Sequence, residues 1–342
     1  MARYLGLGLA FALSAAVAVP SAQSKELVYS IIGAPKHIYN VEVVGGWAKA
    51  VEEATKGAVT VKVLPASAAP PPRLYDAVRA RVVDVAHTFN GFLEKNAPLI
   101  QLSMMPLIYT TAEANAVALW RTYEKFFKDK NQFPGVKLLG FASNPGGISC
   151  SLKGPIDSVA AIKSLKMWTL PGYAAEALTA LDVTILPGPA VRMYELVSKG
   201  TVDGFSGIAM GDVEAFKVDG FATSCTAFPG AIFTATFSMI MNQDAWNDLT
   251  PAEQKAVMSV SGEPFAHRSS VLDGSEKAAY AKFRASGKTI IEAKGKFAAD
   301  LKKAWTPIED KWVVQADKLG VDGKAALAYY QEQAKAVATG GK

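Results

Sequence analysis

The hydrophobic positions in the N-terminal third of the chain alternate between the period of a strand and that of a helix. Val59–Leu64 alternates apolar and polar side chains, whereas the apolar residues of Tyr39–Ala54 recur at helical spacing. Shorter patterns predict a strand over Glu26–Ile32, a helix over Leu74–Arg81 and a strand over Val82–Thr88. This strand–helix–strand order predicts an α/β domain with a largely parallel sheet.

The rest of the chain repeats this alternation and ends in helices. A helix is predicted over Thr111–Asp129, and the turn Asn144–Gly147 is expected to carry the chain between two domains. From Thr250 to about Ser286 the pattern stays helical, a length suited to spanning both domains, and its Thr-Pro-x-Glu start is typical of a capped helix. Further strands are predicted over Val136–Ala142, Phe221–Phe228 and Phe233–Met241.

The N-terminus has a different pattern. Arg3 precedes an apolar run, Leu5–Val19, which is followed by Pro20 and small residues. This order predicts a secretory signal peptide over residues 1–24, so the mature chain is expected in the periplasm. A membrane anchor is the alternative, which is disfavoured because the run is shorter than the ~20 residues of a spanning helix.

Composition and charge limit the class of function. A chain of 342 residues is expected to form two domains. The net charge of +5 is dispersed, without the clustered basic and aromatic residues that bind nucleic acid. His37, His87 and His267 have no metal-ligand spacing, and no nucleophile–base motif occurs. We therefore expect neither catalysis nor a metal or other cofactor.

Cys150 and Cys225 are the two cysteines of the chain. Export would place them in an oxidising compartment, where two cysteines can form a disulfide. Two buried thiols are the alternative, because the sequence does not determine the geometry that a disulfide requires.

Several short motifs follow one another in a specific order. Together they resemble the extracytoplasmic solute receptors of TRAP (tripartite ATP-independent periplasmic) transporters. Each motif is weak alone, but the likeness extends over nearly the whole mature chain. The motifs are Gly57–Pro65 (GAVTVKVLP), Val82–Ala86 (VVDVA), Met105–Leu107 (MPL), Leu165–Pro171 (LKMWTLP), Val202–Gly204 (VDG) and Met241–Leu249 (MNQDAWNDL).

The resemblance implies two α/β lobes joined by hinge strands and a long helix that spans both, a periplasmic-binding-protein fold that closes over a small ligand. The first lobe would comprise residues 25–142 and 229–262, the second residues 143–228 and 263–292, with C-terminal helices over 293–342. Such receptors are usually monomers that deliver a solute to membrane symporter subunits. A periplasmic sensor that presents its ligand to a membrane kinase is the alternative.

The implied ligand site departs from the family pattern. Trp168 stands where the family usually has the arginine that binds a carboxylate, Gly207 replaces an asparagine, and Ala190 replaces an aromatic residue of some members. These changes imply an organic acid with an aromatic or apolar body, or else a neutral or cationic solute. In the other interpretation Trp168 packs in the core, and Arg73, or next Arg192, binds a carboxylate.

The resemblance also implies that ligand contacts come from loops that follow strands. In the second lobe the segment after the Val-Asp-Gly turn supplies candidates beside Gly207, whereas Phe89 in the first lobe is assigned to the core. The remaining candidate ligand-binding residues are His37, Tyr39, Asn90, Phe92, Phe205 and Ser206.

Overall fold

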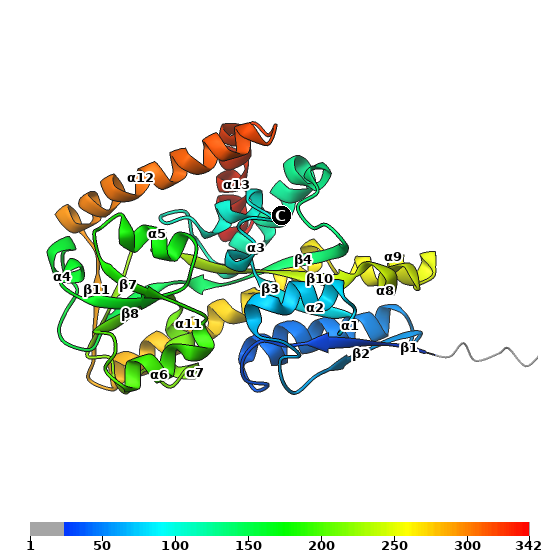
Figure 1. The fold of residues 1–342 in the computed structure, drawn as a ribbon, viewed down its shortest axis with the longest axis horizontal. Coiled ribbons are helices and arrows are strands. Elements are labelled where there is room, and N and C mark those ends of the chain that lie inside the picture. Colours follow the sequence, from blue (N-terminus) through cyan, green and yellow to red (C-terminus); the bar gives the residue numbers. More distant parts are fainter. Residues whose placement is uncertain (1–23, 342) are drawn as a thin grey trace, which may run out of the picture.

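The computed structural model describes residues 24–341, so the predicted signal peptide lies, except for Ser24, outside the described residues. The chain forms two α/β lobes, each built on its own sheet, with helices lying along both (Figure 1). The two-lobed α/β fold that the resemblance implied is confirmed.

The sheet of the first lobe has the strand order β2-β1-β3-β10-β4. Strands β2, β1 and β3 are parallel, while β10 is antiparallel to both of its neighbours. The sheet is therefore largely parallel, as predicted, with one reversed strand that returns from the second lobe. Its strands are β1 (Lys25–Ser30), β2 (Val59–Val63), β3 (Val85–Phe89), β4 (Val136–Gly146) and β10 (Thr234–Asn242).

The sheet of the second lobe has the order β11-β9-β5-β8-β6-β7. Strands β8, β6 and β7 are parallel, and β5 is antiparallel to both β8 and β9. Its strands are β5 (Ile148–Ser151), β6 (Lys166–Thr169), β7 (Thr184–Pro187), β8 (Gly204–Ile208), β9 (Ser224–Ala227) and β11 (Thr289–Glu292).

Two chain crossings between the lobes lie side by side. The first runs from β4 through Gly147 into β5, and the second enters β10 after Phe233. The Gly147 N–H donates to the Phe233 carbonyl at 2.7 Å, which joins the two crossings. A Cβ at Gly147 would lie 2.8 Å from the backbone of Gly207, so only glycine fits this close approach.

The helices cover the sheets and connect the lobes. Some are preceded by single 3₁₀ or π turns, among them the turn Tyr39–Val44 that leads into α1. The α-helices are α1 (Gly45–Ala54), α2 (Leu74–Arg79), α3 (Ala112–Thr122), α4 (Val159–Lys163), α5 (Tyr173–Thr179), α6 (Met193–Ser198), α7 (Met210–Ala215), α8 (Gln243–Asn247), α9 (Pro251–Ser259), α10 (Glu263–His267), α11 (Ser270–Ala285), α12 (Gly295–Lys318) and α13 (Gly323–Ala338).

The continuous helix predicted from Thr250 to Ser286 was wrong in its continuity. The capping box of Thr250 and Glu253 starts α9 as the sequence indicated, but the helix ends at Ser259. Gly262 then has a φ of +58°, in the left-handed region, and α10 and α11 follow as separate helices. A Cβ at Gly262 would lie 2.7 Å from the Trp120 ring, so this break is built into the packing.

Helix α11 contacts both lobes, packing on α3 and β4 of the first and on α7 and β11 of the second. Two carboxylates of α11 each cap one helix, the first in one lobe and the second in the other. Asp273 accepts the N–H groups of Ala112 (2.8 Å) and Glu113 (3.2 Å) at the start of α3. Glu276 accepts those of Met210 (2.7 Å) and Gly211 (2.8 Å) at the start of α7. The longer α12 also runs along both lobes (Figure 1).

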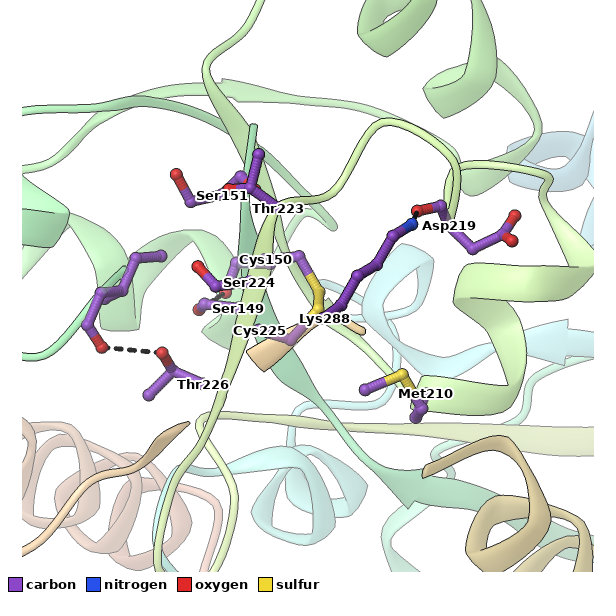
Figure 2. Close-up of a disulfide and its surroundings, with 12 residues drawn as sticks. Ser149, Cys150, Ser151, Met210, Asp219, Thr223, Ser224, Cys225, Thr226 and Lys288 are labelled. Carbon is purple, nitrogen blue, oxygen red and sulfur yellow. Dashed lines mark hydrogen bonds between the residues drawn. A yellow bond between two sulfur atoms is a disulfide. The ribbon is translucent and has the colours of Figure 1, made fainter. Parts of the chain in front are cut away.

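Cys150 and Cys225 form a disulfide. They are direct partners in the antiparallel pairing of β5 and β9, with Cα atoms 4.0 Å apart. Figure 2 shows the two side chains joined between neighbouring strands, with the Lys288 side chain beside them reaching to the Asp219 carbonyl. The disulfide therefore joins the middle of the second sheet, and the alternative of two thiols is wrong.

Candidate ligand-binding cleft

A cavity of about 720 Å³ lies between the two lobes. The first lobe contributes residues that follow β1, β2 and β3, and the second contributes residues that follow β6, β7 and β8. Open α/β sheets bind ligands outside the carboxyl ends of their strands, so this is where each sheet is expected to present a ligand site. The volume suits one small organic molecule.

Aromatic rings form the wall that the first lobe contributes. The Tyr39 ring centroid lies 4.7 Å from that of His87 and 5.2 Å from that of Phe237. Phe89 continues the cluster, 6.0 Å from Phe237 and 5.1 Å from Phe92. All five rings line the cavity. Offset and edge-on arrangements of this kind accept a further aromatic ring readily.

The wall of the second lobe is made of small and aliphatic residues, and Phe216, directly after α7, is its one aromatic ring among the described residues. Gly207 has a φ of +86°, and a Cβ there would lie 3.2 Å from that of Ala174, so the residue stays small. The other apolar residues of this wall are Leu170, Pro189, Ala190, Val191, Ile208 and Ala215.

The charge in the cavity is sparse. Among the described residues its lining includes neither lysine nor arginine, and its one carboxylate is Asp212. His37 Nε2 lies 3.0 Å from Asp212 Oδ1, and Asn144 Nδ2 donates to Asp212 Oδ2 at 3.0 Å. Burial lowers the pKa of His37, but the hydrogen bond and charge of Asp212 outweigh that effect and raise the pKa overall. Both oxygens of Asp212 therefore already accept hydrogen bonds from protein groups.

His87 is a neutral member of the aromatic wall. Its ring is buried, and a hydrogen bond of 3.1 Å joins His87 Nδ1 to the Tyr29 hydroxyl. Burial, with the nearby His37, lowers the pKa of His87 to about 3. His87 is thus a core histidine satisfied by hydrogen bonding that also lines the cavity.

Four buried polar atoms near the cavity have no hydrogen-bond partner in the described part of the protein. In the first lobe these are the Tyr39 hydroxyl and Asn40 Oδ1. In the second they are Trp168 Nε1, next to Gly188, and Thr169 Oγ1, next to Gly207. Unpaired buried polar groups are rare in folded proteins. Tyr39 and Asn40 line the cavity and point to a polar ligand group as their partner, whereas Trp168 and Thr169 lie behind its second-lobe wall.

Half of the candidate residues from the sequence meet in this cavity. His37 and Tyr39 lie in its first-lobe wall together with Phe92, and Ala190 and Gly207 lie in the opposite wall. They come from four separate segments, which are the loops after β1, β3 and β7 and strand β8 itself. The expected contacts from loops after strands identified the first-lobe residues, and the departures from the family pattern identified Ala190 and Gly207.

The structure places the other half outside the lining. Arg73 is exposed and lies 3.5 Å from Asp76 in an ion pair, and Arg192 is likewise exposed. Asn90 is buried in a hydrogen-bonded network with Thr236 and Ser238. The last three, Phe205, Ser206 and Trp168, are buried in the second sheet. Ser206 forms a hydrogen bond with Ser149, and the Trp168 indole packs behind Gly188.

Many lining residues were missed, among them His87, Phe89, Asn144 and Asp212. His87 and Phe89 are two positions apart on β3, and their partners in β10 are Met239 and Phe237. The strand period placed both on one face, but nothing in the sequence showed that this face turns to the cavity. Asn144 lies on the crossing strand β4 and Asp212 on α7, and only the fold brings them into contact. No local sequence pattern indicates that contact.

The model of the family "bacterial extracellular solute-binding protein, family 7" matches residues 30–315. The outer membrane transporter protein TsaT of Comamonas testosteroni is 34% identical over 326 residues, which cover 95% of this chain and 96% of that protein.

Solved structures agree with this assignment. A TRAP periplasmic solute-binding protein of Bordetella bronchiseptica, with bound (R)- and (S)-mandelate, superposes with a TM-score of 0.88 at 27% identity, covering 91% of this chain and 99% of that one. A TRAP solute-binding protein of Rhodoferax ferrireducens with benzoate has the same fold, with a TM-score of 0.83 at 24% identity over 91% and 98% of the two chains.

In residues 24–341 no helix is long and apolar enough to cross a membrane. The matching family consists of receptors that bind solutes rather than of enzymes. The chain belongs to family 7 of the bacterial extracellular solute-binding proteins and is an extracytoplasmic solute receptor of the TRAP type.

Proposed function

We propose that this receptor binds an aromatic monocarboxylate in the cavity between its lobes and delivers it, as a periplasmic monomer, to TRAP membrane subunits. The observation that carries the proposal is the wall of five rings around Tyr39 and Phe237. Burying a phenyl ring against such a wall supplies most of the binding free energy of a small aromatic acid. The relative from Bordetella bronchiseptica, which holds mandelate, supports the same ligand class.

The carboxylate would be held by neutral donors. The Tyr39 hydroxyl from one lobe and the Thr169 hydroxyl and Trp168 Nε1 from the other are buried and unpaired among the described residues. A hydrogen bond from a neutral donor to a charged carboxylate contributes about 1.5–3 kcal/mol net, and a buried donor left unpaired is costly. In this arrangement Trp168 takes part through its N–H while its ring packs in the second sheet.

A cationic ligand is less well supported. The one carboxylate in the described lining, Asp212, already accepts one hydrogen bond on each oxygen, from His37 and Asn144, which weakens its attraction for a ligand ammonium group. The hydrogen bonds that His37 and Asn144 donate to Asp212 therefore favour an anionic over a cationic ligand.

Isothermal titration of residues 25–342 with benzoate, mandelate, benzylamine, benzyl alcohol and succinate tests the proposal. We expect benzoate or mandelate to bind and the other three compounds to bind far more weakly. Binding of benzylamine or benzyl alcohol in preference to the acids would overturn the assigned charge. Binding of succinate alone would overturn the aromatic assignment.

Tyr39→Phe supplies the matched control for the acid group. It keeps the ring in the wall and removes only the hydroxyl, so the affinity for benzoate should fall about tenfold while the fold is unchanged. Thr169→Val should have a similar effect from the other lobe. Unchanged affinity in both variants would show that the carboxylate lies elsewhere.

A further inference from the structure

Three polar side chains from three parts of the fold meet beside the ligand cavity. His37 belongs to the segment after β1, Asp212 to α7 of the other lobe, and Asn144 to the crossing strand β4. The contacts are 3.0 Å from His37 Nε2 to Asp212 Oδ1 and 3.0 Å from Asn144 Nδ2 to Asp212 Oδ2. The first of these contacts directly joins the two lobes across the cleft.

The geometry of this group is fully determined by hydrogen bonds. His37 Nδ1 accepts the backbone N–H of Tyr39 at 3.2 Å, which leaves the proton on Nε2 to donate to Asp212. Asp212 is 7% exposed, and each of its oxygens has a donor. Charge-assisted hydrogen bonds in such partly buried positions are among the stronger ones in proteins.

The same three residues also line a second cavity, of about 360 Å³. That cavity lies against α11 and has charged side chains in its wall, among them Lys36, Glu276 and Lys282. His37, Asn144 and Asp212 therefore stand between the ligand cavity on one side and this second cavity on the other. Removing one of these side chains would join the two spaces.

We propose that His37, Asn144 and Asp212 form a latch that fixes the separation of the lobes and so limits the length of ligand that the cleft accepts. The limit on length rests on the proposed function, because it takes the larger cavity as the site of an aromatic acid. The latch itself does not, because it is a contact between the lobes. Specificity would then come from this polar partition as well as from the aromatic wall.

The latch is tested without ligand by small-angle X-ray scattering of the wild type, His37→Ala, His37→Gln and Asp212→Ala. Glutamine can still donate to Asp212, so His37→Gln should keep the wild-type radius of gyration. His37→Ala and Asp212→Ala should both increase it. Equal radii in all four proteins, with circular dichroism showing that each is folded, would overturn the latch.

The limit on length is tested by titrating the same proteins with benzoate, 3-phenylpropanoate and 4-phenylbutanoate. In the wild type we expect 4-phenylbutanoate to bind at least tenfold more weakly than benzoate. His37→Ala should reduce that ratio at least fivefold, and His37→Gln should preserve it. An unchanged ratio in His37→Ala would overturn the role in specificity. Failure of all three acids to bind the wild type would instead overturn the proposed function, and scattering would still decide the latch.

Discussion

The two lobes face the same cavity with different chemistry. The first presents five rings in mutual contact, from Tyr39 through Phe89 to Phe237. The second presents small and aliphatic side chains, such as Ala190 and Gly207, with unpaired donors behind them. Shape recognition is thus concentrated on one lobe, while the other supplies a thin cover and hydrogen-bond donors. A receptor built in this way can hold a ring on the first lobe before the second lobe closes on it.

The internal bonding of the lobes differs as well. The second sheet carries the disulfide of β5 and β9, and among the described residues the first sheet has none. Replacing Cys150 and Cys225 by serine should lower the free energy of unfolding by about 4 kcal/mol, the value expected for a loop of this size. Denaturant unfolding measures the loss, and hydrogen exchange should show weaker protection in the second sheet first. Equal loss of protection in both sheets would contradict the separation of the lobes.

Glu276 and Asp273 attach α11 to different lobes, and burial raises the pKa of both carboxyls. Burial raises the pKa of Glu276 from 4.5 to about 7, so the folded state binds the proton more tightly than the unfolded state. The contribution of Glu276 to stability should therefore be fully present below pH 4.5 and fall by about 3 kcal/mol as pH rises through 7. Urea unfolding between pH 4.5 and 7.5 measures this slope.

Glu276→Gln should flatten that slope, since glutamine does not titrate. It should also lose one of the two bonds to α7 and be less stable at low pH by about 1 kcal/mol. Burial also raises the pKa of Asp273, so Asp273→Asn is the matched variant for the first lobe. An unaltered slope in Glu276→Gln would exclude this carboxyl as its source.

Phe92 and Phe216 are a matched pair for comparing the two walls, because both are half-buried and both line the cavity. The Phe92 ring contacts Phe89, with centroids 5.1 Å apart. Phe92→Ala should therefore weaken binding of an aromatic acid about tenfold, and Phe216→Ala by no more than about threefold. Titration with benzoate compares them, and equal losses would mean that both walls recognise the ring.

Arg73→Ala is the smallest change. The side chain is 73% exposed and outside the lining, so affinity for benzoate should change less than about twofold. A loss of tenfold or more would support the other interpretation, in which Arg73 binds the carboxylate in place of the family arginine.

The sequence predicted those parts of the molecule that depend on local pattern. Strand and helix periods identified most elements, the loops after strands led to His37 and Phe92, and a departure from the family pattern led to Ala190. The continuity of the helix after Thr250 was mispredicted because the break at Gly262 depends on packing against Trp120, which is distant in sequence.

Contacts between the two lobes could not be predicted from the sequence. His37 and Asp212 are 175 positions apart, and no sequence motif links the two residues. The resemblance assigned Trp168 to the arginine position, and the structure places it in β6 with its indole buried and outside the cavity lining. The indole N–H lies next to Gly188, a contact that no sequence pattern indicates.

The two capping carboxylates of α11 have a mechanical consequence. Asp273 and Glu276 are one helical turn apart, yet each anchors a helix of a different lobe. Rotation of one lobe against the other must therefore be absorbed as torsion within that single turn or by release of one anchor. This turn of α11 therefore resists torsion between the lobes. Its stiffness contributes to the work that a bound solute must supply to change the angle between them.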